Sequence, residues 1–117
     1  MNEYKISEHT TENLNKLKQF ISNKKTVTFK ILNISKLSTI ADYFLIISMD
    51  NMRAVESLKD DLIDFCEEHN IEIRNKEGIT SPWVLIDLND IVIHVFTEEM
   101  RSFYNLERLW ADAEVVE

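Results

Sequence analysis

Glycine, proline and cysteine are nearly absent from this sequence, with one of each among 117 residues. Gly78 and Pro82 are the strongest breakers of regular structure, so no flexible linker divides the chain. The hydrophobic share of 44% is enough for one packed core, whereas two cores would leave each half of the chain too small to be stable. We therefore predict one domain over residues 1–117.

The single cysteine, Cys66, excludes an internal disulfide and suits a reducing compartment. Zinc clusters need several soft ligands at close spacing, which this sequence lacks, so no structural metal or cofactor is expected. No apolar run approaches the length of a membrane span, and the polar N-terminus lacks the apolar stretch of a leader. These absences predict a cytoplasmic protein without a membrane partner.

The formal charge of −8 argues against a protein that holds nucleic acid through its phosphates, because that mode relies on clustered Lys and Arg. Little direct nucleic-acid binding is therefore expected, and a basic protein surface is the more natural partner. Net charge also keeps many cytoplasmic domains dispersed, so charge alone identifies no partner.

Two amphipathic helices are predicted from apolar residues at helical spacing. The first ends near Ser22, and its candidate N-caps are Ser7, Thr10 and Thr11. The second runs roughly from Asn51 to His69, and Asn70 can take the left-handed conformation that closes a helix. Its apolar stripe consists of Val55, Leu58, Leu62 and Phe65.

About five strands are predicted from the remaining apolar pattern. Residues 27–31 alternate as a half-buried strand does, and the continuous run 43–47 indicates a central strand covered on both faces. Ile71 and Ile73 indicate the start of a third strand, followed by a loop around Gly78 to Pro82. Together these elements predict an α/β domain in two or three layers, in which helices flank a mixed sheet.

The last two strands form a predicted hairpin from Trp83 to Phe96, because Asn89-Asp90 suits a two-residue turn with positive φ. Pairing Leu88 with Ile91 fixes the register and separates two faces. The aliphatic face consists of Val84, Ile86, Leu88, Ile91, Ile93 and Val95. The mixed face consists of Trp83, Leu85, Asp87, Val92, His94 and Phe96. We expect the aliphatic face under the helices, and the mixed face either against a partner or as a second core layer under the C-terminal segment.

The sequence offers little support for catalysis. It has no patterned nucleophile and base, and the glycine-rich loops that cradle phosphates are missing. Cys66 is expected to be a packed thiol rather than a reactive one. His94 could pair with Asp87 as an acid-base couple, but a hydrogen-bonded structural histidine is the commoner outcome. After Thr97, a short helix with an acidic start is predicted.

Four ordered motifs identify a family resemblance. They are STIADYF at residues 38–44, WVLID at 83–87, DIVIHVF at 90–96 and FYNLERLW at 103–110. In this combination they resemble the ribosomal silencing factor family (RsfS, also called Iojap), over about residues 10–113. The resemblance implies a fold related to nucleotidyltransferases without their catalytic motifs, and a protein that is not an enzyme.

The resemblance also implies a partner and a mechanism. Family members bind ribosomal protein fourteen of the large ribosomal subunit, which would block joining of the small subunit and repress translation when nutrients are scarce. A related role in assembly of the large subunit is implied too. The contact residues carried onto this sequence are Trp83, Asp87, His94, Phe96, Tyr104, Leu106, Glu107 and Trp110, although Trp110 could equally be core. Pro82 and Asn89 stand where the family commonly has glycine.

Two other interpretations remain open. The first is an enzyme with a nucleotidyltransferase-like cleft, which is disfavoured because Met49 stands where small residues are usual and paired strand carboxylates are missing. The second is a homodimer formed through the face that carries Trp83, Leu85 and Phe96. Such a dimer could coexist with ribosome binding or serve another protein partner.

Overall fold

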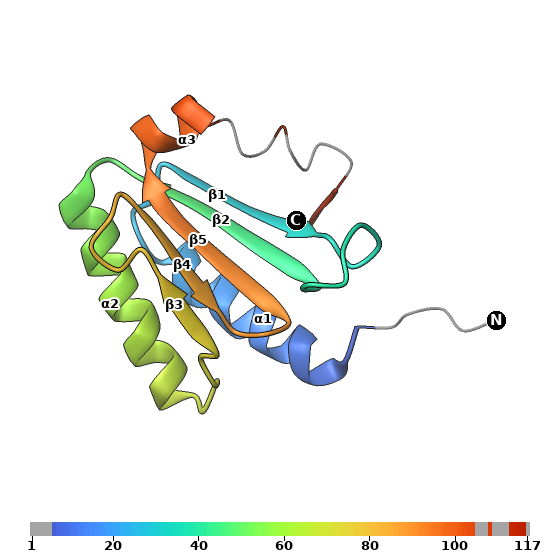
Figure 1. Ribbon diagram of the computed structural model, residues 1–117. Helices are drawn as coiled ribbons and strands as arrows, with labels where there is room; N and C mark the ends of the chain where they lie inside the picture. Colours follow the sequence, from blue (N-terminus) through green and yellow to red (C-terminus); the bar gives the residue numbers. More distant parts are fainter. Residues whose placement is uncertain (1–5, 105–107, 109–112, 117) are drawn as a thin grey trace.

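The computed structural model describes residues 6–104, 108 and 113–116, and in this part of the chain six strands form one sheet (Figure 1). The helices are α1 (Glu8–Ser22), α2 (Met52–Glu68) and α3 (Glu98–Tyr104). The strands are β1 (Thr28–Asn33), β2 (Tyr43–Met49), β3 (Asn75–Glu77), β4 (Trp83–Asp87), β5 (Ile91–Thr97) and β6 (Glu114–Val116). Their order across the sheet is β3-β4-β5-β2-β1-β6. The predicted α/β class with a mixed sheet is confirmed.

The centre of the sheet is a parallel pair, β2 with β5, while the other neighbouring strands are antiparallel. Every residue of β2 is buried, which confirms that the run 43–47 forms a central strand covered on both faces. β3 and β6 are edge strands of three residues each, and β6 was not expected from the sequence. Strands this short carry too little periodicity to be recognised.

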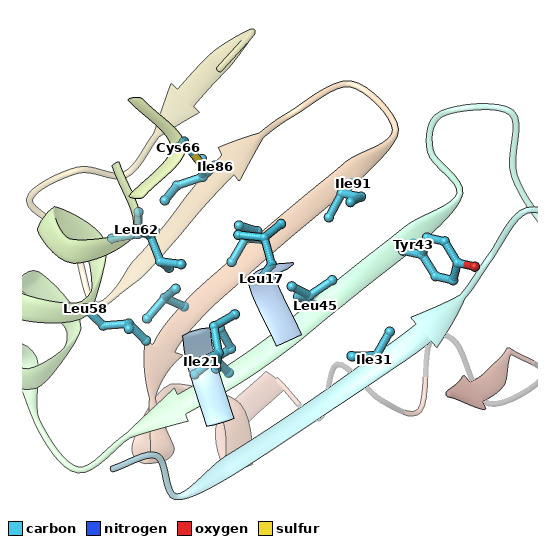
Figure 2. Close-up of a cluster of buried hydrophobic side chains, with 14 of the residues drawn as sticks. Leu17, Ile21, Ile31, Tyr43, Leu45, Leu58, Leu62, Cys66, Ile86 and Ile91 are labelled. Carbon is cyan, nitrogen blue, oxygen red and sulfur yellow. The ribbon is translucent and has the colours of Figure 1, made fainter. Parts of the chain in front are cut away.

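Both long helices pack on the same face of the sheet. Figure 2 shows Leu17 and Ile21 of α1 and Leu58 and Leu62 of α2 above the strands, with Leu45 of β2 among them. All five side chains are buried. Because burial of apolar area is the main favourable term in folding, this layer between helices and sheet is the principal core.

Ser7, one of the three candidates, is the N-cap of α1, and Asn51, the predicted start of the second helix, is the N-cap of α2. Ser7 Oγ accepts a hydrogen bond of 3.1 Å from the Thr10 backbone N–H, and Asn51 Oδ1 accepts one of 2.9 Å from that of Ala54. These bonds satisfy backbone donors that the first turn of a helix leaves unpaired. Asn70 has a φ of 57°, as expected for a residue that closes α2.

Two predicted positions are wrong. The strand expected from Ile71 and Ile73 begins later, at Asn75, because Ile71 is a buried residue of the connection whose N–H donates to Cys66 O at 2.8 Å. On α2, Cys66 rather than Phe65 completes the buried stripe. Phe65 lies at the rim of the core and stacks on Phe20 of α1, with 4.3 Å between ring centroids.

Candidate protein-binding site

The β4–β5 hairpin has the register that the sequence predicts. Trp83 pairs with Phe96 and Leu85 with His94, and the Leu88 N–H donates to Ile91 O at 2.8 Å. Asn89 has a φ of 80°, so the asparagine supplies the positive φ that the turn requires. The alternation of side chains along each strand therefore assigns the aliphatic residues to the helix side and the mixed residues to the opposite side.

The side of the sheet opposite α1 and α2 is here called the outer face. Part of it is covered and forms a second hydrophobic core. On β5 its side chains are buried, including His94 and Phe96, and a cluster of buried residues surrounds them. This cluster consists of Leu32, Ile34, Ala41, Phe44, Ile46, Val92 and Phe96. Met100 of α3 and Ala113 pack against it from the far end of the chain. The expectation of a second core layer is thus correct for the β5 part of the outer face.

The β4 part of the outer face remains accessible. Trp83, Leu85 and Asp87, here called the β4 outer row, are half-buried, whereas the helix-side residues between them are buried. Beside this row, the exposed edge strand β3 places Asn75 opposite Asp87 and Glu77 opposite Leu85. The accessible part of the outer face is therefore a small strip, apolar at Trp83 and Leu85, with the polar residues Asn75 and Glu77 at its border.

Trp83 is the largest side chain of the row and is held in place. Its indole Nε1–H donates a 3.2 Å hydrogen bond to Nδ1 of His94, and its ring meets the Phe96 ring edge-on with 5.8 Å between centroids. Below it, Gly78 has a φ of +67° and lies against the Trp83 carbonyl, where a Cβ would not fit. The loop at Gly78 therefore restricts the backbone of Trp83, and the hydrogen bond to the buried His94 restricts its side chain.

His94 is only 8% exposed and is packed edge-on against Phe44 at 4.9 Å between ring centroids. Burial lowers its pKa from 6.5 to about 4, because a charged imidazole would lose its hydration. The ring is therefore neutral at physiological pH. Its Nδ1 accepts the indole proton, so Nε2 carries the ring proton, and this atom has no hydrogen-bond partner among the described residues.

Asp87 is engaged with Arg74 instead of His94. Arg74 Nε and Nη2 lie 3.2 and 2.7 Å from Asp87 Oδ2, and the Asn89 backbone N–H donates to Oδ1 at 2.7 Å. His94 Nδ1 is occupied by Trp83. The acid-base couple considered for Asp87 and His94 is therefore not formed.

The eight predicted contact residues fall into three groups. Trp83 and Asp87 belong to the β4 outer row, whereas His94 and Phe96 lie beside this row on β5 and are buried, Phe96 with 0% exposure. Phe96 therefore has no exposed surface that a partner could touch. Tyr104 is the last residue of α3, and its side chain lies outside the described residues, as do Leu106, Glu107 and Trp110 entirely.

Three residues of this face were missing from the predicted set. Leu85 stands between Trp83 and Asp87 in the row, and the alternation of β4 already placed it there. Asn75 and Glu77 were missed because their strand was predicted a few residues too early. The 79% exposed Phe103 lies on α3, inside the FYNLERLW motif, and that motif was the available signal.

Other features of the described chain point to no metal or membrane site. No group of three or more His, Cys, Asp or Glu residues in residues 6–104, 108 and 113–116 is arranged to hold a metal ion. Within the same part of the chain, no helix is both long and apolar enough to cross a bilayer. A cleft of about 330 Å³ with a mixed polar and apolar lining lies between α1 and the β4–β5 turn, and His9, Thr10, Arg74 and Asp90 are among its lining residues.

Comparison with known proteins identifies the family. The family model described as "Ribosomal silencing factor during starvation" (RsfS) matches residues 7–117. A ribosomal silencing factor RsfS from Halalkalibacterium halodurans is 42% identical over 98 residues, which cover 83% of this chain and 84% of that protein. The RsfS of Bacillus subtilis is 38% identical over 92 residues, covering 78% of each chain.

A solved structure supports the same assignment. A crystal structure of a protein from Bacillus halodurans superposes with a TM-score of 0.79 at 36% identity, covering 92% of this chain and 98% of that one. The family description names a regulator of the ribosome rather than an enzyme. On sequence and fold together, this chain belongs to the RsfS family of ribosomal silencing factors.

Proposed function

We propose that this chain silences ribosomes by occlusion in the cytoplasm. It binds ribosomal protein fourteen of the large subunit and sterically blocks joining of the small subunit, which represses translation under nutrient limitation. Assistance in assembly of the large subunit belongs to the same proposal, because it requires the same contact. No covalent step is needed.

The observation that carries this proposal is the β4 outer row, in which the half-buried Trp83 is held by a hydrogen bond to His94. Aromatic side chains that are fixed before binding lose little conformational entropy in a complex, and they are enriched at interface centres. Leu85 adds apolar area beside the indole. The aromatic and aliphatic side chains of the row suit contact with a protein. The row itself contains no nucleophile paired with a base and no glycine-rich loop for a phosphate.

Charge supports a basic protein partner. The chain carries 21 acidic and 13 basic residues, and Glu77 is exposed at the border of the row. Complementary charge mainly speeds association and selects among partners, while the apolar centre supplies affinity. The same negative charge disfavours direct contact with ribosomal RNA.

Co-sedimentation with purified large subunits tests the proposal, with the wild type compared to Trp83→Ala and Phe20→Ala. Phe20 is the matched control, because it is a half-buried aromatic residue on the helix side of the molecule. Thermal unfolding verifies that each variant is folded. We expect saturable binding of the wild type and of Phe20→Ala, and loss of about 2 kcal/mol or more of binding free energy in Trp83→Ala.

Two further measurements test the partner and the mechanism. Binding to isolated ribosomal protein fourteen should show the same order of variants, and light scattering of mixed subunits should show that the wild type slows their joining. Absence of wild-type binding would remove the proposal, and binding without any effect on joining would remove occlusion. Sedimentation velocity of the free protein reports whether it forms a dimer. If the dimer forms through the same row, Trp83→Ala should reduce the apparent mass from that of a dimer toward that of a monomer.

A further inference from the structure

The family resemblance implies one contact set that includes both Trp83 and His94, but the structure gives these two residues different degrees of burial. Trp83 is half-buried, whereas His94 is only 8% exposed and is packed next to the indole. A buried side chain can contribute to a contact only through the residue that it holds. The 3.2 Å bond from Trp83 Nε1 to His94 Nδ1 is such a connection.

We propose that His94 is a positioning residue for the partner contact, and that it acts as the neutral Nε2–H tautomer whose Nδ1 accepts the indole proton of Trp83. This role rests on the proposed binding of ribosomal protein fourteen. It assigns to His94 no direct contact with the partner. The affinity at the β4 outer row therefore depends on an acceptor atom at the position of Nδ1 and not on the imidazole charge.

Hydrogen-bond chemistry determines the tautomer. The indole nitrogen of tryptophan can only donate, so the histidine nitrogen that faces it must be unprotonated. A charged imidazole would turn a donor toward the indole N–H and break the bond. Burial lowers the His94 pKa and so supports the neutral ring that this geometry requires.

The surroundings of His94 leave the indole with a defined orientation. Phe96 meets the Trp83 ring on one side, and Phe44 packs against the imidazole edge. Nε2 is enclosed and has no partner among the described residues. Rotation of the imidazole by half a turn would exchange Nδ1 with Cδ2, so the indole N–H would face carbon instead of an acceptor. The Trp83 bond is thus the polar interaction that the described structure offers to hold the ring in one orientation.

The first test is spectroscopic and uses the full chain. A multiple-bond ¹H–¹⁵N spectrum at neutral pH should show His94 with Nε2 protonated and Nδ1 unprotonated. The chain has two tryptophans, so Trp83→Phe identifies the Trp83 indole N–H signal by its loss. A His94 ring that is protonated at Nδ1, or charged at neutral pH, would overturn the proposal.

The second test compares two variants of nearly equal shape, His94→Asn and His94→Leu. The asparagine oxygen lies near the position of Nδ1 and can accept the indole proton, whereas leucine cannot. We expect His94→Leu to bind large subunits about tenfold more weakly than the wild type, with a shifted Trp83 indole signal. His94→Asn should restore most of the affinity and the wild-type indole signal.

The results separate this proposal from the proposed function. If the wild type fails to bind large subunits, the silencing contact is wrong and the positioning role falls with it. If the wild type binds and the two folded variants bind equally well, the positioning role alone is wrong. Equal loss in both variants with an intact indole signal in His94→Asn would also overturn it, since the acceptor would then not be the feature that matters.

Discussion

Thr10 in the first turn of α1 donates a 2.9 Å hydrogen bond from its hydroxyl to Oδ2 of Asp90, which follows 80 residues later in the chain. Thr10 is 2% exposed, and its Oγ1 also accepts a bond of 2.9 Å from the Ser7 hydroxyl. The Asp90 carbonyl in turn accepts from the backbone N–H groups of Asp42 and Tyr43. One aspartate thus joins the start of α1, the β4–β5 turn and the start of β2.

Thr10→Val tests the contribution of this bond to stability. The substitution keeps the shape of the side chain but removes the hydroxyl, which leaves the buried side of the Asp90 carboxylate without its donor. We expect a loss of about 1–3 kcal/mol in the free energy of unfolding, measured by chemical denaturation. Thr11→Val is the matched control, because Thr11 is exposed in the same helical turn. Thr11 donates its hydroxyl to the Ser7 carbonyl at 3.2 Å, so equal effects of the two variants would show that the Asp90 bond contributes no more than this exposed local bond.

Gly78→Ala should disturb both stability and the binding face. Gly78 has a φ of +67°, which disfavours any side chain, and an added Cβ would collide with the Trp83 carbonyl. We expect a loss of about 1–3 kcal/mol in the free energy of unfolding and a shifted Trp83 indole N–H signal in the NMR spectrum. Glu77→Ala, at the preceding exposed position, should change stability by no more than about 0.5 kcal/mol. An unshifted indole signal in Gly78→Ala would mean that the loop does not set the position of Trp83.

The hairpin could be predicted closely because its signals are local. Alternation along β4 and β5 and the Asn89-Asp90 turn fix which residues pair and which share a face. The parallel pairing of β2 with β5 is different, because it joins segments separated by α2, β3 and β4 and leaves no mark in the periodicity of either strand. Strand order was therefore not readable from the sequence.

The degree of burial of each candidate site residue is the property that the sequence predicts least well. The register places Trp83 and Phe96 side by side, yet one is half-exposed and the other has no exposed surface. That difference arises from β1, β2 and α3, because Leu32 and Ile46 belong to the same buried cluster as Phe96 and Met100 packs against that cluster. The Trp83–His94 bond likewise depends on side-chain orientations that no pattern of residue types encodes.

Asp87→Asn should affect partner binding much less than Trp83→Ala. The Asp87 side chain is 14% exposed, and both of its oxygens already accept bonds from Arg74 and from the Asn89 backbone. Its charge is therefore compensated within the protein, and little net charge is left at this position to attract a partner. We expect a change in affinity to the large subunit of less than about threefold, or roughly 0.7 kcal/mol. A loss as large as that of Trp83→Ala would identify Asp87 as a direct anchor.

Cys66 should react with alkylating reagents only when the chain unfolds. Its side chain lies on the core-facing side of α2, and burial raises the thiol pKa from 9.0 to about 11. Because the thiolate is the reactive form, the native thiol should be protected at about pH 8, while the chain in denaturant reacts fully. Rapid alkylation of the folded protein would contradict this packing.

The same pKa shift gives Cys66 a signed effect on alkaline stability. A thiol whose folded pKa is raised contributes stability that is fully present below about pH 9, and this contribution is lost as pH rises toward 11. Cys66→Ala is therefore expected to be less stable than the wild type at neutral pH because of the cavity, but to lose less additional stability across this alkaline range. Parallel stability curves for the two proteins would show that the thiol does not titrate with the fold.

His94 should make the fold sensitive to mild acid. Its folded pKa is lowered from 6.5 to about 4, so the unfolded chain binds the proton more readily than the native one. The contribution of the neutral imidazole is fully present above about pH 6.5 and is lost as pH falls toward 4, with a full size of about 3 kcal/mol.

Carboxylates titrate in part of the same range, so the informative quantity is the difference between wild type and variant across pH. His94→Asn and His94→Leu both remove the titrating group, and both should show a shallower loss of unfolding free energy between about pH 7 and pH 4 than the wild type. The two variants should show the same slope even though they differ in their bond to Trp83. The slope depends on the number of protons taken up on unfolding and not on the presence of a hydrogen-bond acceptor. Slopes equal to that of the wild type would mean that His94 takes up a proton in the folded state as easily as in the unfolded chain, which the enclosed ring beneath Trp83 does not allow.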